Sequence, residues 1–304
     1  MSRCLSFLLM LVYVSSLQAE PWDVRRVTTV ALPNAYRLHA DVLSGGLPED
    51  ELGFIELKKL GVKTIISVDG ANPNVEMARR HGLRYVHLPH GYDGIETDHA
   101  LRLAKAIREL PKPIYIHCHH GKHRSPAAAI VASVGAGLLP SEQNLQLGFL
   151  QTAGTSEHYI GLYSAAKLAR PFPVRQLTLL QVEFKELVEV PPLAKAMVEI
   201  DETNRRLSLT REAGWRTSPE SPDVEPAHEA LILKEHFREL LRAEKEKQSP
   251  EFLKILENSA DASAELESQL RESPSDLLSI QASWLSIQRD CRACHRDYRD
   301  RPLR

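Results

Sequence analysis

A cysteine and an arginine separated by five residues, Cys118 and Arg124, carry the clearest chemical signal in the sequence. They lie between a short apolar run typical of a buried strand and a second apolar run typical of a helix. A loop this short wraps its backbone N–H groups around a tetrahedral anion at the positive end of the following helix. The same field favours ionisation of a thiol to a nucleophilic thiolate, and an arginine can hold two phosphoryl oxygens. The spacing therefore predicts a nucleophilic, oxyanion-binding loop.

The segments around this loop alternate between strand and helix patterns. Strands are expected over 36–43, 62–68, 84–88 and 113–117, and helices over 48–60, 74–81, 97–110 and 125–137. The strand runs are apolar and often β-branched, whereas the helix runs begin and end at residues that favour helix termini. Such alternation with short connections predicts an α/β domain over 20–169, with a central sheet flanked by helices.

The order of residues in the loop resembles that of the cysteine-based phosphatases, specifically the dual-specificity-like group with His-Cys-x5-Arg-Ser/Thr. The resemblance covers about residues 30–168. It implies that Cys118 is the nucleophile that forms a phospho-cysteine and that Arg124 clamps the phosphate. It also implies that Ser125 is the hydroxyl beside the thiolate and that His117 is the buried residue that orients the cysteine.

This family also needs a general acid, an aspartate upstream of the cysteine that protonates the leaving alkoxide. Asp93 is the first choice, because it follows the strand expected over 84–88 and is flanked by glycines on a loop that can move. Asp98 is the second choice, although a position near a helix start suits interaction with the helix dipole. Asp69, just after a strand, is the third choice.

The loop between the cysteine and the arginine is rich in basic side chains. The predicted substrate-binding residues are His119, His120, Gly121, Lys122 and His123. Three interpretations remain open: solvent-facing side chains, a metal cluster, or a cationic rim for a highly phosphorylated substrate. The Gly-Lys-x-Arg piece resembles the loops of lipid and inositol-phosphate phosphatases. The expected partner is therefore a phosphoprotein, a phosphoinositide or an inositol phosphate.

Residues 291–295 read CRACH, a second motif with chemistry of its own. Two thiols at this spacing can form thioethers with haem vinyl groups, and the adjacent imidazole can ligate the iron. The motif predicts one covalent c-type haem per chain, attached at Cys291 and Cys294, with His295 as an axial ligand. Both cysteines continue the apolar stripe of the last helix. A zinc site is the alternative, but it would want a fourth ligand and usually a second cysteine pair.

Strand patterns largely stop after the α/β domain. Residues 170–190 are interpreted as a linker or lead-in helix, because RPFP at 170–173 is typical of a stiff connection. Amphipathic helices are expected over 192–209, 227–247, 250–271 and 275–299. Four such helices predict an all-α four-helix bundle over 191–304.

The haem motif near the end of the chain, within CHRDYR, closely resembles that of cytochrome c prime, a family of four-helix bundles. The resemblance covers about 175–304 and is strongest in the last helix. It implies that His295 is the proximal ligand, that the distal side is empty or apolar, and that the chain forms a homodimer. Met197 is interpreted as a core residue, with a distal haem contact as the alternative. His228 and His236 are further distal candidates that fit a helix surface better.

The first 19 residues have the pattern of a secretory signal, with a basic start, an apolar run and small residues near Ala19. The run is short for a membrane span, so we expect cleavage near Ala19, a periplasmic location and no transmembrane span in the mature chain. An uncleaved N-terminal anchor is the alternative. Cys4 leaves with the signal, and the other three cysteines lie in the two motifs, so none remains for a structural disulfide.

Composition narrows the class of protein. The 304 residues are 43% hydrophobic and 26% charged, which is typical of a globular chain. The 38 basic and 40 acidic residues leave a formal net charge of −2, which gives no attraction to nucleic acid. The motifs predict an exported phosphomonoester hydrolase joined to a haem domain that senses redox state or a small gas ligand.

Two alternatives remain open. The first is a haem protein that transfers electrons to a redox partner or binds a gas, and whose front domain only binds a phosphorylated ligand. The second is a sulfur-transfer enzyme in which Cys118 carries a persulfide. The Arg-Ser ending of the loop and the presence of Asp93 favour phosphate over sulfur.

Overall fold

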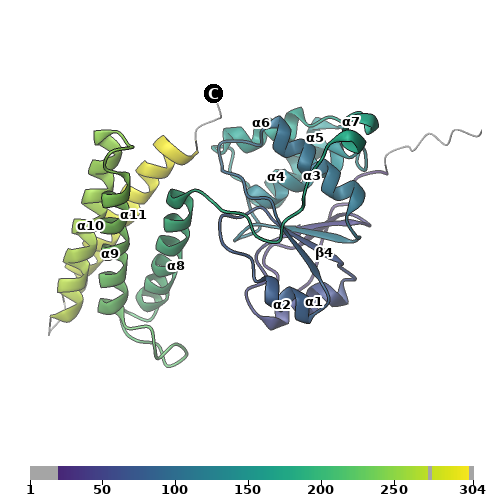
Figure 1. Ribbon diagram of the computed structural model, residues 1–304. Helices are drawn as coiled ribbons and strands as arrows, with labels where there is room; N and C mark the ends of the chain where they lie inside the picture. The colour runs from purple at the N-terminus through teal and green to yellow at the C-terminus, as the bar shows by residue number, and fades with distance from the viewer. Residues whose placement is uncertain (1–19, 273–275, 301–304) are drawn as a thin grey trace, which may run out of the picture.

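The computed structural model describes residues 20–272 and 276–300. An α/β part and a group of long helices lie beside each other, with α8 nearest to the α/β part (Figure 1). The expected secretory signal and Cys4 lie outside the described residues. None of the helices within the described ranges is both long and apolar enough to span a membrane.

Six strands form one mixed sheet in the order β1-β2-β3-β6-β4-β5. Their bounds are β1 Arg25–Arg26, β2 Tyr36–His39, β3 Val42–Gly45, β4 Thr64–Ser67, β5 Arg84–His87 and β6 Ile114–His117. The strands β3, β6, β4 and β5 run parallel, while β1 and β2 are antiparallel to their neighbours. The carboxyl ends of the four parallel strands therefore meet at one edge of the sheet.

The expectation of a single strand over 36–43 is wrong. The chain turns between β2 and β3, and Tyr36 pairs with Ser44 in an antiparallel register. The turn is fixed locally, because the backbone N–H of Asp41 donates to Nδ1 of His39 at 3.0 Å. Apolar residues alternate with polar ones from Tyr36 through the turn to Val42, so the pattern did not reveal the reversal.

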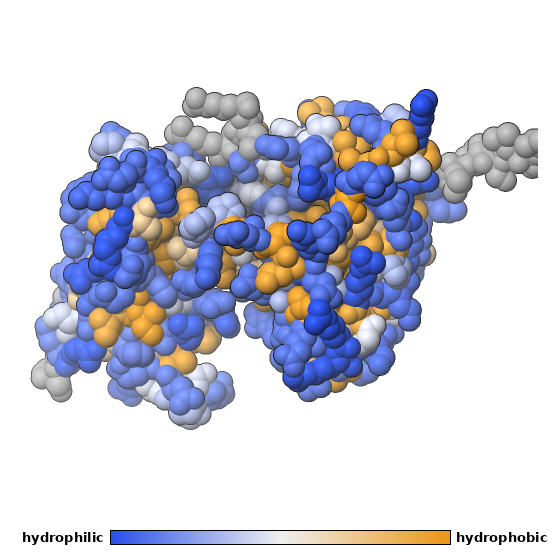
Figure 2. Space-filling model, in the orientation of Figure 1, coloured by the Kyte–Doolittle hydropathy of each residue, from blue (hydrophilic) through white to orange (hydrophobic). Residues whose placement is uncertain are grey.

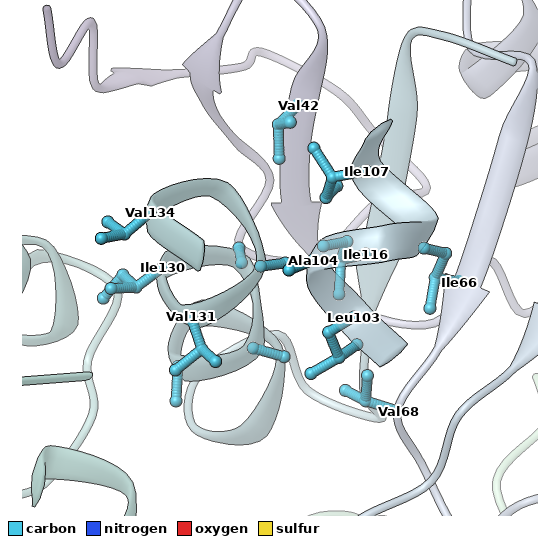
Figure 3. Packing of buried hydrophobic residues seen from close by; sticks show 14 of the residues in the cluster. Val42, Ile66, Val68, Leu103, Ala104, Ile107, Ile116, Ile130, Val131 and Val134 are labelled. Carbon is cyan, nitrogen blue, oxygen red and sulfur yellow. The ribbon is translucent and has the colours of Figure 1, made fainter. Parts of the chain in front are cut away.

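Helices cover both faces of the sheet, as the strand–helix alternation predicted. Helices α1 (Glu51–Lys59) and α2 (Val75–Arg80) pack on one face, and α3 (Thr97–Glu109) and α4 (Arg124–Gly135) pack on the other (Figure 1). Successive strand residues point to opposite faces. Ile65 thus joins the core under α1 and α2, whereas Ile66 joins the core under α3 and α4 (Figure 3).

Three more helices complete the α/β part: α5 (Gln143–Thr152), α6 (Ile160–Leu168) and α7 (Val174–Leu179). The helix α7 lies within the segment expected to be a linker or lead-in, and it is attached to the α/β core. Leu177 is buried there, and its carbonyl oxygen accepts from Nζ of Lys105 at 2.8 Å. The following residues run beside β5, where the N–H of His87 donates to the carbonyl of Lys185 at 2.9 Å.

Four long helices follow, as expected: α8 (Pro192–Glu212), α9 (Pro226–Glu244), α10 (Pro250–Arg271) and α11 (Leu277–Cys294). They enclose an apolar core that includes Leu207, Leu233, Leu266 and Ile287. Hydrophilic side chains cover most of the visible face of these helices, with smaller hydrophobic patches among them (Figure 2). These amphipathic helices bury their apolar stripes against one another.

The last helix differs in detail from the expectation. The α-helix ends at Cys294, and one π-helical turn, η1 (His295–Arg299), follows it. The apolar stripe through Ile280, Trp284, Ile287, Cys291 and Cys294 faces the core of the helices. Residues at its two ends are more exposed: Leu277 is 59% exposed, and Tyr298 is 42% exposed although its ring lies 5.0 Å from that of the core residue Phe252.

Candidate active site and haem-attachment motif

The predicted nucleophilic loop connects the carboxyl end of β6 to the first residue of α4. The strand β6 lies between β3 and β4 in the sheet, and every residue from Ser125 to Gly135 in α4 is buried. The loop is therefore held on both sides by buried elements. It lies at the edge where open α/β sheets commonly bind ligands.

The backbone of the loop points its carbonyl groups outward. Three of them accept hydrogen bonds from neighbouring segments: His119 O from Leu47 N (3.0 Å), His120 O from Asn34 Nδ2 (2.8 Å) and Lys122 O from Thr155 Oγ1 (2.6 Å). Within the described ranges, no backbone N–H of residues 119–123 donates a hydrogen bond. Free donors at the start of a buried helix form an anion-binding cradle.

Gly121 is required by this geometry. Its φ of +72° lies in the left-handed region, and a Cβ would lie 2.4 Å from the backbone nitrogen of Gly46. The loop thus packs directly on the Gly45–Gly46 segment after β3. Tyr115 supports the same segment, since its hydroxyl donates to the carbonyl of Gly46 at 2.6 Å.

Cys118 and Ser125 are in contact, as the phosphatase resemblance implies. The sulfur of Cys118, a residue 3% exposed, lies 3.3 Å from the hydroxyl oxygen of Ser125. The Ser125 hydroxyl in turn donates to the carbonyl of Gly45 at 2.9 Å. While that bond exists, the Cys118 thiol is the donor to Ser125. Once the thiol is ionised, the Ser125 hydroxyl can rotate and donate to the sulfur.

His117 is buried behind the cysteine, as expected. Burial lowers the pKa of His117 to about 4, so the ring is neutral at neutral pH. Its Nε2 lies 2.6 Å from the hydroxyl of Tyr85, and burial raises the pKa of that phenol. A protonated Tyr85 therefore donates to Nε2, which leaves the ring proton on Nδ1, 3.4 Å from the carbonyl of Cys118.

Arg124 is fixed by an acid and an aromatic ring. Its Nη2 lies 3.1 Å from Oδ2 of Asp69, and its guanidinium carbon lies 4.6 Å from the ring centroid of Tyr92. The Nε atom is buried and has no hydrogen-bond partner among the described residues. A buried, unpaired donor beside the loop cradle leaves one N–H of the guanidinium available for an oxyanion.

The three candidate acids occupy different environments. Burial opposes ionisation of Asp69, but Arg124, the backbone N–H of Ala71 and nearby histidines together outweigh burial and hold the pKa of Asp69 at about 2, so this carboxylate is ionised beside the arginine. Asp98 forms an exposed ion pair with Arg102 at 2.9 Å on the surface of α3. Burial raises the pKa of Asp93, which is the direction a general acid requires. Asp93 also directly follows Tyr92, whose ring contacts Arg124.

The basic side chains of the loop divide into two groups. His123 packs on Tyr159, with ring centroids 4.5 Å apart. His119 and His120 approach Asp201 of α8, and their potential ligand atoms all lie within 4.8 Å of one another. The metal interpretation of the loop thus acquires a third donor from a distant helix.

The residues of CRACH fit a covalently attached haem. Cys291, Cys294 and Cys118 are free, and the first two contact the core of the helices. Burial raises the pKa of both CRACH thiols to about 11 and lowers that of His295 to about 4. A neutral imidazole is the form that ligates iron. Two unpaired thiols one helical turn apart, followed by that imidazole, provide the donor set for a c-type haem.

The three residues considered as distal haem ligands lie in different environments. Met197 is half-buried and packs against the core of the C-terminal helices, in keeping with its interpretation as a core residue. His228 is exposed, and His236 lies 4.0 Å from the carboxylate of Glu199.

Two residues beside the Cys118–Arg124 loop, Tyr92 and Arg299, were missed by reasoning from the sequence. Their only sequence signals are adjacency to Asp93 and a place four residues after His295.

Comparisons with known proteins show a structural likeness only. No protein-family model matches the sequence, and no curated protein matches it either. The structure is similar to that of TpbA from P. aeruginosa, with 20% identity, a TM-score of 0.41 and coverage of 52% of this chain and 94% of TpbA. A Cys→Ser variant of TpbA in complex with phosphotyrosine gives 21% identity, a TM-score of 0.41 and coverages of 54% and 96%.

A candidate phosphatase of the DUF442 group from Shewanella putrefaciens CN-32 is also similar. It has 21% identity and a TM-score of 0.37, and the match covers 45% of this chain and 88% of that chain. These values describe shape alone. The fold and loop define an α/β domain with a cysteine-containing oxyanion cradle, followed by a helical part with a haem-type motif.

Proposed function

We propose that this protein is a phosphomonoester hydrolase that acts through a phospho-Cys118 intermediate. The observation that carries the proposal is the loop over residues 118–125. Its carbonyls are bonded outward, its N–H groups are free among the described residues, and the cysteine and arginine lie at its two ends. A phosphoryl group has the tetrahedral shape and negative charge that such a cradle accommodates.

The first chemical step transfers the phosphoryl group to sulfur. The thiolate of Cys118 attacks phosphorus, an S–P bond forms, and the P–O ester bond breaks. Arg124 and the loop N–H groups stabilise the charge on the equatorial oxygens. Asp93 gives its proton to the leaving alkoxide, which departs as an alcohol.

The second step regenerates the enzyme. A water molecule attacks phosphorus, Asp93 accepts its proton, and the S–P bond breaks to release orthophosphate. The bonding electrons return to Cys118 as a thiolate. Ser125 donates its hydroxyl proton to this sulfur as a hydrogen bond, and its position 3.3 Å away suits that role.

The substrate is proposed to be a phosphoprotein, a phosphoinositide or an inositol phosphate. Lys122 is exposed on this loop and adds positive charge around the phosphate site, while burial lowers the pKa of His120 and of His123 and favours their neutral forms. The experiment measures phosphate release from aryl, peptide, lipid and inositol phosphates under reducing conditions. We expect release by the haem-loaded protein and none by Cys118→Ser. No release from any substrate by fully reduced protein contradicts the proposal.

The C-terminal helices are proposed to bind one c-type haem through Cys291 and Cys294, with His295 on the iron. When bound, a haem supplies a redox-active iron and a site for a small gas. The chain's own residues provide two thiols for attachment and an imidazole held neutral by burial. Export to the periplasm, a redox partner and a homodimer are part of the same proposal. Mass spectrometry of the mature protein tests cleavage near Ala19 and the added haem together.

A further inference from the structure

We propose that Arg299, which follows the haem-type motif, is a positioning residue for the phosphatase site. The inference rests on the proposed hydrolase function. The end of α11 reaches toward the α/β part (Figure 1), and the two parts meet across the middle of the molecular surface above a hollow (Figure 2). Arg299, in the turn that follows α11, contacts two aromatic residues of the α/β part.

The contacts of Arg299 are specific. Its guanidinium carbon lies 4.2 Å from the ring centroid of Tyr92 and 5.8 Å from that of Tyr159. Its Nη2 donates to the Tyr159 hydroxyl at 3.3 Å, and its Nε donates to Oδ1 of Asp300 at 2.6 Å. Both the planar face and the N–H groups of the side chain are therefore used, and a lysine cannot reproduce both.

Tyr92 is shared with the phosphate-binding arginine. The guanidinium groups of Arg124 and Arg299 both lie over this one ring, at 4.6 and 4.2 Å from its centroid. Each cation has its own carboxylate, Asp69 for Arg124 and Asp300 for Arg299. These carboxylates offset the repulsion between the two positive charges. The ring of Tyr92 consequently contacts groups from both parts of the chain.

Two consequences follow for the reaction. Tyr92 limits where the guanidinium of Arg124 can lie, so an ordered Tyr92 favours one orientation of the phosphate clamp. Asp93 is the next residue, and its carbonyl lies against α6 close to Gly161. Anchoring the Tyr92 ring therefore also restrains the backbone that carries the proposed general acid. Arg299 touches neither the substrate nor the reacting atoms, so it acts through Tyr92.

The test compares Arg299→Ala and Arg299→Lys with Arg296→Ala in the haem-loaded, full-length protein. Arg296 is a matched control, because it lies in the same turn, is exposed, and pairs with its neighbour Asp297 at 2.8 Å. We expect Arg299→Ala to lower kcat/KM about tenfold, Arg299→Lys to recover part of that loss, and Arg296→Ala to change nothing. Equal kinetics for Arg299→Ala and Arg296→Ala overturn the inference.

A second readout separates this inference from the proposed hydrolase activity. In the Cys118→Ser background, calorimetry measures binding of orthophosphate without turnover. We expect the Arg299→Ala change to weaken this binding several-fold relative to Arg296→Ala. If the parent protein binds phosphate but hydrolyses nothing, the hydrolase proposal fails, and the binding comparison alone decides the role of Arg299. Equal phosphate affinities in the two variants contradict the inference.

A double-mutant cycle distinguishes an effect of Arg299 that acts through Tyr92 from a general effect on folding. Tyr92→Leu removes the ring that Arg299 contacts, so the losses from Tyr92→Leu and Arg299→Ala are expected to be strongly non-additive. Additive losses show that Arg299 does not act through Tyr92. Circular dichroism and haem content monitor the integrity of each variant.

Discussion

Arg299 lies over Tyr92 at 4.2 Å from its ring centroid, although 207 positions separate the two residues in the sequence. Tyr92 lies in the loop after β5 and contacts Arg124, the proposed phosphate clamp, while Arg299 lies in the turn that begins at His295 of the CRACH motif. The backbone N–H of Asp300 also donates to the carbonyl of His295 at 2.9 Å. The two motifs that the sequence presents as separate are thus connected by a short path of side chains.

This path offers a physical basis for a hypothesis of coupling, in which the redox state of a bound haem, or a gas on its iron, changes the rate of the proposed hydrolase. Coupling between two sites requires an element that both sites influence, and proximity by itself does not demonstrate it. The hypothesis is tested by measuring kcat/KM with the iron oxidised, reduced and bound to nitric oxide. Equal values in the three forms contradict coupling and leave the positioning role of Arg299 unaffected.

Replacing Asp93 by asparagine tests the assignment of the general acid. The variant is expected to lose activity about 100-fold toward substrates with poor leaving groups and much less toward activated aryl phosphates. Burial raises the pKa of Asp93, and activity depends on its protonated form. The rate therefore falls as pH rises through that pKa in the parent protein, and this decline disappears in Asp93→Asn. Asp98→Asn, which alters only a surface ion pair, is the control.

A different pH effect is expected from Asp69, on stability. Its pKa in the folded protein is about 2, below the ordinary value of 3.8, because Arg124, the backbone N–H of Ala71 and nearby histidines together outweigh the effect of burial. The folded state therefore binds fewer protons than the unfolded state between these values. Ionised Asp69 contributes about 2 kcal/mol of stability above pH 4, which is lost as pH falls toward 2.

Chemical denaturation of the parent protein and of Asp69→Asn between pH 2 and 6 measures this contribution. The variant is expected to be less stable at pH 6 and to show a weaker decline on acidification. An identical pH dependence in both proteins would show that Asp69 is not the group responsible.

Alanine substitutions at Gly121 and Gly137 distinguish the effect of backbone strain from the effect of steric overlap. Both have a φ of +72°, but a Cβ on Gly121 meets the backbone of Gly46 at 2.4 Å, whereas a Cβ on Gly137 meets nothing within 4 Å. Gly137→Ala is expected to cost about 1–2 kcal/mol of unfolding free energy and to leave activity unchanged. Gly121→Ala is expected to cost more and to abolish phosphate binding. Similar activities of the two variants would argue against the tight loop packing.

The haem assignment predicts different outcomes for two variants. Replacing both Cys291 and Cys294 by serine removes covalent attachment, which mass spectrometry of the denatured protein detects as loss of the haem mass. Met197→Leu is expected to leave the absorption spectrum of the iron unchanged, because Met197 packs in the helical core. A changed spectrum in Met197→Leu assigns it a distal contact instead. Retained haem mass in the double serine variant contradicts attachment at these cysteines.

Several features of the fold and site could be predicted because they are local. The loop from Cys118 to Arg124 is bounded by a strand and a helix, so spacing alone determines which groups can surround an anion. The same holds for Ser125, in contact with the sulfur at 3.3 Å, and for two cysteines one turn apart on a helix. The reversal between β2 and β3 escaped prediction, because the alternation of apolar and polar residues continues through the turn.

The sequence by itself determined the reactive groups and their local geometry, since a few intervening residues leave the backbone few choices. Only the tertiary structure decided which distant groups adjust their chemistry. Asp69 meets Arg124 because β4 and β6 are neighbours in the sheet, and Arg299 meets Tyr92 because the last helix ends beside the α/β part. Such contacts depend on how the helices and strands pack against one another, and the spacing of residues along the chain does not reveal that packing.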